Sequence, residues 1–416
     1  MGVTLGMGLR SMSRDSQLGA LAGLKVIDLS RVLGGPSCSQ MLGDHGADVV
    51  KIEPPQGDET RGWGPPFLDG TASYFIGVNR NKRGMALDLP KPEGRDVLFR
   101  LLEKADVLLE NFKTGTLERW GMGYDAVLKA KFPRLIHCRV SGFGADGPLG
   151  GYPGYDAAIQ AMSGLMSLNG EDGGEALRVG VPVVDMATGL NATIAILLAL
   201  TERARSGQGQ FVEATLYDSA VALLHPYAAN WFLSQKPPQR TGNAHPNVAP
   251  YDQFHTKTKP IFLAVGNNRQ FARLCAEIGR PELTEDRRFR DNKDRTTNRP
   301  ALRHELEKAL AAQDGEALTI RLLDRGVPCG VVQDLPGALT HAHTRHRDMV
   351  YERGRYQGLG NAIKMSRTPP ALRRTPPDFA EANRELLAQA GYSDAEIERL
   401  IKSGIVVMTL QKAAQD

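Results

Sequence analysis

The fold is decided by the stretch KVIDLSRVLGGPSCSQMLGDHGADVVKI, residues 25–52. Lys25–Leu29 is a short apolar run typical of a buried strand, and Val49–Ile52 is a second one. Between them, Gly34-Gly35-Pro36 predicts a sharp turn and Ser37–His45 predicts a helix. A strand, a helix and a strand within so few residues indicate a βαβ unit with two parallel strands.

The same alternation continues along the N-terminal half. It predicts three further strands and two further helices: Met85–Leu89, Val107–Glu110 and Leu135–Val140 as strands, Glu93–Lys104 and Tyr124–Ala130 as helices. We therefore expect an α/β fold whose large domain is a doubly wound, Rossmann-like sheet. In such sheets ligands bind at the carboxyl ends of the strands.

The alternation of predicted strands and helices ends near Ala228. After this residue prolines interrupt the chain, and predicted strands mix with predicted helices. Four regions are predicted: 1–20 as a disordered N-terminal extension, 21–227 as the large domain, 228–332 as a smaller α+β domain, and 333–416 as a strap and C-terminal helix returning to the large domain. The predicted elements of the later regions are a strand at Pro260–Val265, helices at Asn268–Ile278, Ala301–Ala312 and Asp394–Lys402, and an extended strap at Gln357–Pro377.

Composition narrows the class of protein. The 416 residues are 41% hydrophobic and 24% charged, and the net charge of +4 is too mild to predict a nucleic-acid partner. The four cysteines are far apart in the sequence, which argues against a disulfide framework and fits a reducing compartment: the cytoplasm, or a mitochondrion in a eukaryote. The continuous apolar runs are shorter than the roughly 20 residues that span a bilayer, so no membrane partner is expected.

One acid lies at the edge of a helix-forming run. Val181–Val184 is predicted to be a buried strand and Leu190–Arg205 a helix, with Asp185 at the junction. Free backbone N–H groups at a helix start would stabilise the ionised carboxylate. The simpler alternative is that Asp185 only caps the helix.

Two motifs resemble binding sites, one for a dinucleotide and one for a metal ion, but the neighbouring sequence argues against both. Gly142–Gly147 matches the dinucleotide pattern G-x-G-x-x-G, but Pro148 and Pro153 prevent the helix that this pattern must open. A flexible loop near a ligand is the better interpretation. The histidines at 341, 343 and 346 have a spacing that does not bring three imidazoles onto one helix face, so no metal site is predicted.

Several motifs together resemble class III CoA-transferases. They are LKVIDLSRVLGGPSCSQMLGDHGADVVKIEPPQGDETRGWGPP (24–66), NRNKRG (79–84), LLENFKTGTLERWGMGYD (108–125), SGFGADGP (141–148), GYDAAIQAMSGLM (154–166), the segment 182–189 and GVPCGVV (326–332). They occur in the order of that family, and they cover nearly the whole chain between its ends.

The resemblance implies roles for individual residues. Asp185 falls on the catalytic aspartate of the family. Positions implied for CoA binding are Val32, Leu33, Arg80, Lys82, Asn111, Phe112, Arg119 and Tyr155, and those implied for the acid substrate are Arg31, Arg61, His245, Gly266 and Asn267. Simpler alternatives remain open: Arg119 as a surface charge, Phe112 as a core residue and Tyr155 as a wall residue without a chemical role.

The implied reaction moves CoA from an acyl-CoA thioester to a free carboxylic acid, a small dicarboxylate, through an aspartyl anhydride and an aspartyl-CoA thioester. Acyl-CoA is then a substrate, with no tightly bound cofactor and no metal, and an interlocked homodimer is expected. Two alternatives stay open: an acyl-CoA racemase or isomerase of the same fold, which carries His where this chain has Tyr155, and a noncatalytic CoA-binding protein. After Pro376-Pro377 the chain also lacks the G-x-H-T pattern of many members.

Overall fold

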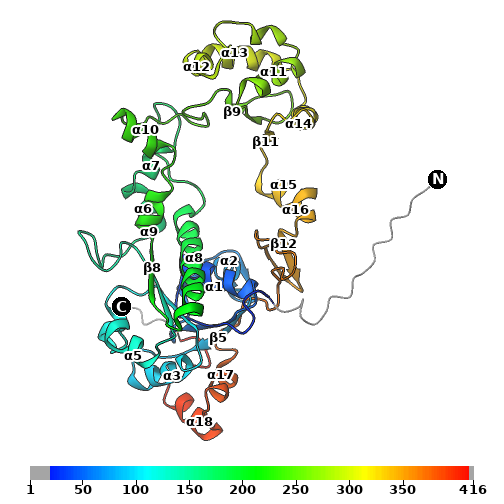
Figure 1. Cartoon of the computed structure of the whole chain (residues 1–416). Coiled ribbons are helices and arrows are strands. Elements are labelled where there is room, and N and C mark those ends of the chain that lie inside the picture. Colours follow the sequence, from blue (N-terminus) through cyan, green and yellow to red (C-terminus); the bar gives the residue numbers. More distant parts are fainter. Residues whose placement is uncertain (1–18, 412–416) are drawn as a thin grey trace, which may run out of the picture. The chain divides into compact units, whose positions relative to one another are not determined.

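The computed structural model describes residues 19–411, whose elements are shown in Figure 1. These residues form two compact units: one contains 19–163, 180–224 and 345–411, and the other contains 164–179 and 225–344. The predicted extension at 1–20 lies, except for its last two residues, outside the described residues. The predicted small domain, 228–332, falls within the second unit, which also takes in 164–179.

The first unit is built on a six-stranded parallel sheet with the order β5-β2-β1-β6-β7-β8. Counted along the chain, this order is 3-2-1-4-5-6, which is typical of the Rossmann fold. The predicted α/β class with a large parallel sheet is confirmed. The strands are β1 (Lys25–Asp28), β2 (Asp48–Glu53), β5 (Lys82–Ala86), β6 (Val107–Glu110), β7 (Ile136–Ser141) and β8 (Phe211–Thr215).

Helices connect these strands, and apolar side chains fill the space between the layers. Val107, Leu108 and Leu109 of β6 are completely buried, as expected for a strand covered on both faces. The helices of this unit are α1 (Gly34–Asp44), η2 (Glu59–Gly62), α2 (Ser73–Gly77), α3 (Pro92–Leu102), α4 (Thr116–Arg119), η3 (Tyr124–Leu128), α5 (Lys129–Lys131), α6 (Asp156–Met162), α8 (Val183–Ser206), α9 (Leu216–Ala222), α17 (Asn383–Gln389) and α18 (Asp394–Lys402).

Two predicted boundaries near the sheet are wrong. Gly34, Gly35 and Pro36 begin α1 rather than forming a separate turn, because proline fits the first turn of a helix, where its missing N–H is not needed. Strand β5 begins at Lys82, three residues before the predicted Met85. Its first two side chains are charged yet buried, so an apolar pattern could not reveal them.

The strand predicted at Val181–Val184 is also wrong, because Val183 already begins α8. This helix runs for 24 residues and, among the described helices, is the one long and apolar enough to cross a membrane by length and composition. The predicted helix, Leu190–Arg205, lies within α8, but the expectation that the apolar segments are too short to span a bilayer is wrong for this helix. Its inner face packs against α1, β7 and β8 within the first unit, while apolar side chains on its other face are exposed.

The second unit contains a small antiparallel sheet, β11-β10-β9, and a shell of short helices over one apolar core. The strands are β9 (Tyr251–Phe254), β10 (Ile261–Ala264) and β11 (Cys329–Val331). The helices are α7 (Leu165–Leu168), α10 (Tyr227–Ser234), α11 (Asn268–Glu277), η4 (Pro281–Thr284), α12 (Asn292–Thr297), α13 (Arg299–Leu310), α14 (Gly315–Asp324) and α15 (Leu335–Thr340), and α16 (Ala342–His346) crosses the boundary between the units.

The C-terminal part of the first unit is fastened to the sheet by polar contacts. It begins with a hairpin of β12 (Val350–Arg353) and β13 (Tyr356–Leu359); another small hairpin, β3 (Phe67–Leu68) with β4 (Thr71–Ala72), follows η2. The Asn81 side chain accepts hydrogen bonds from the backbone N–H of Arg373 at 2.7 Å and Arg374 at 2.9 Å, and it donates to the Ala371 carbonyl at 2.8 Å. The predicted strap is therefore anchored beside β5.

Candidate active site

A cavity of about 220 Å³ lies where the strand order reverses, between the carboxyl ends of β1 and β6. In open α/β sheets this reversal point is the usual ligand site. The loops after β1 and β6 supply two of its walls, and α8 supplies Asp185. The lining residues are Arg31, Val32, Leu33, Gly34, Glu59, Asn111, Phe112, Lys113, Thr114, Val140, Ser141, Gly142, Tyr152, Pro153, Gly154, Tyr155, Asp185 and Leu216.

The loop after β1 is held in an uncommon conformation. Val32 has a φ of 69°, and a β-branched residue rarely adopts this left-handed region. The side chain of Asn111 fixes the preceding residue from both sides: its oxygen accepts from the Arg31 N–H at 2.9 Å, and its amide donates to the Arg31 carbonyl at 2.7 Å. The strain at Val32 is thus stabilised by a side chain from the neighbouring strand end.

Below this loop lies a buried ionic network. The Asp28 carboxylate accepts from the hydroxyls of Ser30 and Ser39, each at 2.5 Å, and lies 3.2 Å from the Lys82 ammonium. The Lys51 ammonium donates to the Ser30 carbonyl at 2.8 Å. Burial alone would raise the pKa of Asp28, but the two ammonium groups and the two serine hydroxyls together outweigh it and lower this pKa. The network fixes the end of β1, from which the cavity wall starts.

Asp185 lies in the first turn of α8, half-buried at the cavity wall. The backbone N–H groups of Val184 and Asp185 donate to the Asp156 carboxylate at 2.8 and 3.0 Å. Burial, and then the negative charge of Asp156, raise the pKa of Asp185 to about 7. The expectation that the helix start stabilises ionised Asp185 is wrong, because Asp156 occupies these N–H groups.

Close packing of α1 against α8 sets the place of Asp185. A β-carbon added at Gly189 would lie 2.2 Å from the Ser37 hydroxyl oxygen, so only glycine allows this approach. A β-carbon added at Gly34 would lie 3.3 Å from the Asp185 carboxylate. Both glycines therefore bring the start of α1 and the first turn of α8 together at the cavity.

A second hollow of about 320 Å³ adjoins the first and shares Arg31, Phe112 and Lys113 with it. Its wall is mostly apolar, and the rings of Phe112 and Trp120 meet edge to face with centroids 5.4 Å apart. The other lining residues are Leu29, Ile52, Pro54, Leu87, Leu89, Pro90 and Thr116. Together the two hollows make one groove along the carboxyl edge of the sheet.

The structure brings together seven of the residues predicted from the sequence: Arg31, Val32, Leu33, Asn111, Phe112, Tyr155 and Asp185 all line the cavity. Arg119 does not. Its exposed side chain donates to the Thr116 hydroxyl at 2.9 Å, and Thr116 lines the adjoining hollow.

Three of the predicted cations lie elsewhere, buried against carboxylates. Arg80 forms two hydrogen bonds with Asp44 at 2.8 and 2.6 Å and donates to the Leu359 carbonyl. Arg61 is paired in the same way with Glu53, at 2.8 and 2.7 Å. Lys82 is completely buried beside Asp28, and burial lowers its pKa to about 8. Their charges are already neutralised within the fold, which favours a structural role.

The remaining predicted residues belong to the second unit. His245 packs on the Tyr251 ring, with centroids 5.0 Å apart, and Asn267 caps α11 by accepting from the Gln270 N–H at 2.9 Å. The N–H of Gly266 donates to the Gln270 side chain at 2.8 Å. Their part in substrate binding stays a prediction. Within residues 19–411, no group of three His, Cys, Asp or Glu is placed to hold a metal ion.

Several polar residues of the cavity region, Thr114 and Ser141 among them, were not predicted as site residues. Glu59, Lys113 and Tyr152 line the cavity, and Asp156 lies directly behind Asp185. Lys113 follows Asn111-Phe112 in the same motif and could have been included on that ground. Nothing local marks Asp156 as the cap of a helix that begins 27 residues later.

Comparisons with known proteins agree with this arrangement. Residues 21–383 match the family model described as CoA-transferase family III. The succinyl-CoA:glutarate CoA-transferase of Mus musculus is 37% identical over 97% of this chain and 95% of its own length. The acetyl-CoA:oxalate CoA-transferase of Acetobacter aceti is 40% identical over 84% of this chain and 90% of its own length.

A solved structure agrees as well. The crystal structure of a CAIB/BAIF family protein from Brucella suis has a TM-score of 0.81 and 40% identity, covering 90% of this chain and all of that one. The resemblance found in the sequence motifs is thereby confirmed over nearly the whole chain. The chain belongs to CoA-transferase family III and is a CoA-transferase.

Proposed function

We propose that this enzyme transfers CoA from an acyl-CoA donor to a small dicarboxylic acid and that Asp185 is its nucleophile. The observation that carries the proposal is the half-buried Asp185 carboxylate at the sheet's reversal point. The other carboxylate on the cavity wall, Glu59, is paired with Arg31 at 3.3 Å. Asp185 therefore remains as the carboxylate without a cationic partner at this wall.

The proposed reaction exchanges acyl groups without oxidation or reduction. The Asp185 carboxylate attacks the donor thioester, the C–S bond breaks, and CoA leaves as a thiolate from a mixed anhydride. The thiolate attacks the aspartyl carbonyl, releasing the donor acid and leaving an aspartyl-CoA thioester. The acceptor carboxylate then attacks this thioester, the C–S bond breaks, and CoA leaves as a thiolate from a second mixed anhydride. The thiolate attacks the acceptor's carbonyl, which forms the new acyl-CoA and releases Asp185 as a carboxylate.

The surroundings of Asp185 suit these steps. Burial raises the pKa of Asp185 to about 7, so its carboxylate is more basic than an exposed one. When this carboxylate forms the mixed anhydride, it loses the negative charge that burial makes costly. Backbone N–H groups of the loop that starts at Gly142, on the cavity wall, are candidates to stabilise an oxyanion. Exclusion of water by the bound substrates would protect the anhydride.

The groove suits CoA in shape and charge. The apolar hollow beside Trp120 fits an apolar or flat part of CoA, and Lys113 lies where both hollows meet. Arginine and lysine are the usual partners of phosphate groups. Arg119, one helical turn beyond Thr116, stays a candidate for the same role.

Arg31 is the strongest of the three candidates for binding the free end of a dicarboxylate. It lines the cavity and its side chain is 38% exposed, whereas Arg61 is buried against Glu53 and His245 lies in the second unit. Relatives named for glutarate and oxalate support a dicarboxylate acceptor. Glu59 would release Arg31 when the substrate carboxylate binds.

A panel of acyl-CoA donors and free acids, read by mass spectrometry of new thioesters, tests this proposal. Succinate and glutarate should be better acceptors than butyrate. Arg31→Gln should lower acceptor kcat/KM about 10- to 100-fold for dicarboxylates and far less for butyrate, because a hydrogen bond to a charged group is lost. Equal rates with butyrate and succinate in the unaltered enzyme would contradict the dicarboxylate assignment.

The racemase alternative has a separate readout. It requires a second base, and the matching position holds Tyr155, whose side chain is 60% exposed. Incubating the enzyme with an acyl-CoA in deuterated water should leave the α-carbon unlabelled while CoA transfer proceeds. Rapid α-deuteration without transfer would favour the alternative.

We also propose that the enzyme acts as a homodimer. An apolar stripe on α8 is exposed: Leu190, Ile194, Leu197 and Leu198 lie at helical spacing, and Leu198 is 65% exposed. A second copy of the chain would cover this stripe. Sedimentation should give a dimer that Leu198→Glu weakens, and a fully active monomer of about 45 kDa would contradict the proposal.

We also propose that the protein is located in a reducing compartment, such as the cytoplasm. The four cysteines are unpaired, and three of them are buried. Burial raises the pKa of Cys38 to about 12, which keeps this thiol unreactive. Fractionation of cells that produce the protein would test the location.

A further inference from the structure

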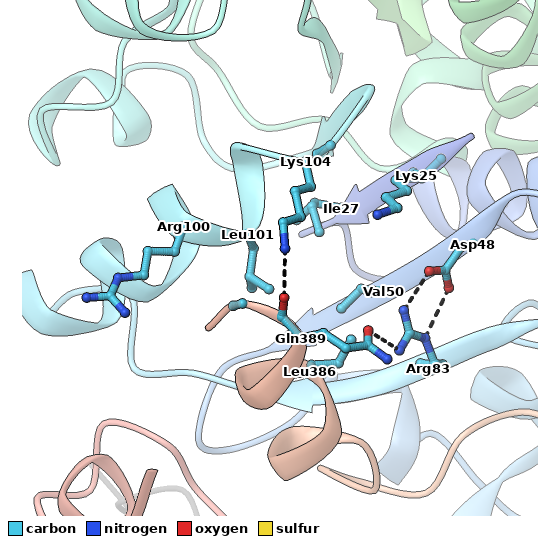
Figure 2. Close-up of a pocket in the computed structure, with 13 residues that line it drawn as sticks. Lys25, Ile27, Asp48, Val50, Arg83, Arg100, Leu101, Lys104, Leu386 and Gln389 are labelled. Carbon is cyan, nitrogen blue, oxygen red and sulfur yellow. Dashed lines mark hydrogen bonds and ion pairs between the residues drawn. The ribbon is translucent and has the colours of Figure 1, made fainter. Parts of the chain in front are cut away.

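A second cavity, separate from the groove, lies at the opposite edge of the sheet (Figure 2). It has a volume of about 240 Å³ and is reached past Lys25 and Asp48, the first residues of β1 and β2. Because these strands are parallel, this is the amino edge, whereas the Asp185 groove lies at the carboxyl edge. The two cavities share no lining residue.

The floor of this amino-edge cavity is apolar. Ile27 and Val50 come from neighbouring strands and Leu386 comes from α17, and all three are at most 5% exposed. A closed apolar cavity of about 150 Å³ is enough to hold benzene. The amino-edge cavity therefore offers room and an apolar surface for a body of that size with a substituent.

The rim carries positive charge. Arg83 uses four of its five N–H donors, in two hydrogen bonds to Asp48 and one each to Glu385 and Gln389. Lys104 donates only to the Gln389 carbonyl, at 3.0 Å, which leaves two of its three donors. The Lys25 ammonium forms no hydrogen bond or ion pair with any residue of 19–411.

Figure 2 shows how these cations are arranged. Lys25 and Lys104 stand on two sides of Ile27 and Val50, while Arg100 points away at the margin. Arg100 stacks on the Tyr392 ring instead, 4.1 Å from its centroid. Two lysines with free donors thus face an apolar floor, and the one carboxylate on the wall, Asp48, is paired with Arg83, which also pairs with Glu385.

We propose that the amino-edge cavity binds a small carboxylate with an apolar body, such as an aromatic or short branched acid, at a site distinct from the Asp185 groove. The carboxylate lies between the ammonium groups of Lys25 and Lys104, and the apolar body rests on Ile27, Val50 and Leu386. Charge and shape both favour this class: a neutral molecule would leave the lysines unused, and a bare inorganic anion would leave the floor uncovered.

Benzoate is the test probe, with benzamide as its neutral counterpart and inorganic phosphate as an anion without an apolar body. Binding is measured by calorimetry with CoA in excess, so that the groove is occupied. Benzoate should bind more tightly than both comparison molecules. Lys25→Gln and Lys104→Gln should each weaken it at least about threefold, as expected for partly exposed charges. Lys402→Gln, a surface lysine of α18 outside the cavity, is the matched control and should change nothing.

A photoreactive azidobenzoate locates the site. Its label should map to peptides containing Lys25 or Lys104 in the unaltered enzyme and equally in Asp185→Asn, so the outcome does not depend on the proposed catalytic role. Equal binding of benzoate and benzamide, unchanged binding in the double variant of Lys25 and Lys104, or displacement of benzoate by CoA would each overturn the proposal.

Discussion

The Asp156 carboxylate accepts a hydrogen bond from the backbone N–H of Asp185 at 3.0 Å. It also accepts from the N–H of Val184, and its second oxygen accepts from the Gln160 amide at 2.5 Å. Asp156 thus takes the donors that a helix start offers and places a negative charge beside Asp185. Burial, and then this neighbouring charge, explain how an acid in the first turn of a helix has a raised pKa rather than a lowered one.

The first prediction concerns pH. Transfer needs ionised Asp185, whose pKa is raised to about 7, so kcat/KM should fall about tenfold for each pH unit below that value. Asp156→Asn removes the neighbouring negative charge but keeps one acceptor oxygen. The acidic limb should therefore move to lower pH, with transfer at pH 8 largely retained. A limb that stays in place in Asp156→Asn would contradict the coupling of the two acids.

Asp185→Asn should make the protein more stable at pH 8. The pKa of this carboxyl is 3.8 in the unfolded chain and about 7 in the folded protein, so its ionisation is more costly in the folded state. The free energy of unfolding therefore falls as the pH rises from about 4 to 7. Asparagine removes the penalty, which is roughly 1–3 kcal/mol after allowance for partial exposure. Denaturant unfolding should show the gain at pH 8 and its disappearance near pH 4. An equal difference at both pH values would argue against this cause.

Asn111→Ala should damage CoA binding through the β1 loop. The variant loses both hydrogen bonds to the Arg31 backbone and frees the strained Val32, which costs about 1–3 kcal/mol of stability. The KM for acyl-CoA should rise along with this loss. Asn298→Ala is the control: it removes an amide that donates to two carbonyls in the second unit, and it should lower stability without changing this KM.

Arg80 should prove structural rather than a phosphate ligand. Arg80→Gln breaks a buried pair with Asp44 and should lower the free energy of unfolding by about 3–5 kcal/mol. Arg80→Lys keeps the charge, so it should fold with a smaller loss and an unaltered KM for acyl-CoA. If either variant showed a large rise in this KM at an unchanged melting temperature, Arg80 would bind a CoA phosphate and the structural assignment would be wrong.

The sequence predicted the parts of the fold that depend on local pattern. Strand β6 has the predicted bounds, Val107–Glu110, because an apolar run marks it. Helix α18 also has its predicted bounds, Asp394–Lys402, because its amphipathic pattern is local, and a capping box at Ser393 fixes its start. Strand β5 was shifted because Lys82 and Arg83 are buried, and only distant carboxylates make that burial possible. Such pairing is invisible in a local pattern.

In the candidate site, too, residues on local motifs could be predicted from the sequence, whereas roles that depend on distant partners could not. Asp185, Asn111 and Val32 fall on family motifs and do meet in one cavity. The basic motif at 79–84 was predicted to bind CoA, but its cations form ion pairs inside the fold. A run of cations next to a sheet can bind phosphates or buried carboxylates equally well. Asn81 and Arg80 hold the segment around 359–374, which is separated from them by almost 300 residues. Only the folded chain distinguishes these two uses.

The central claim is that Asp185 becomes covalently attached to the acyl group and then to CoA. The most direct measurement supplies an acyl-CoA donor without acceptor, quenches with hydroxylamine and maps the product by peptide mass spectrometry. The account predicts a hydroxamate at Asp185, in the peptide that contains residues 181–190, and its loss in Asp185→Asn, which should still bind CoA but not transfer it. A hydroxamate at another residue, or undiminished transfer by Asp185→Asn, would contradict it.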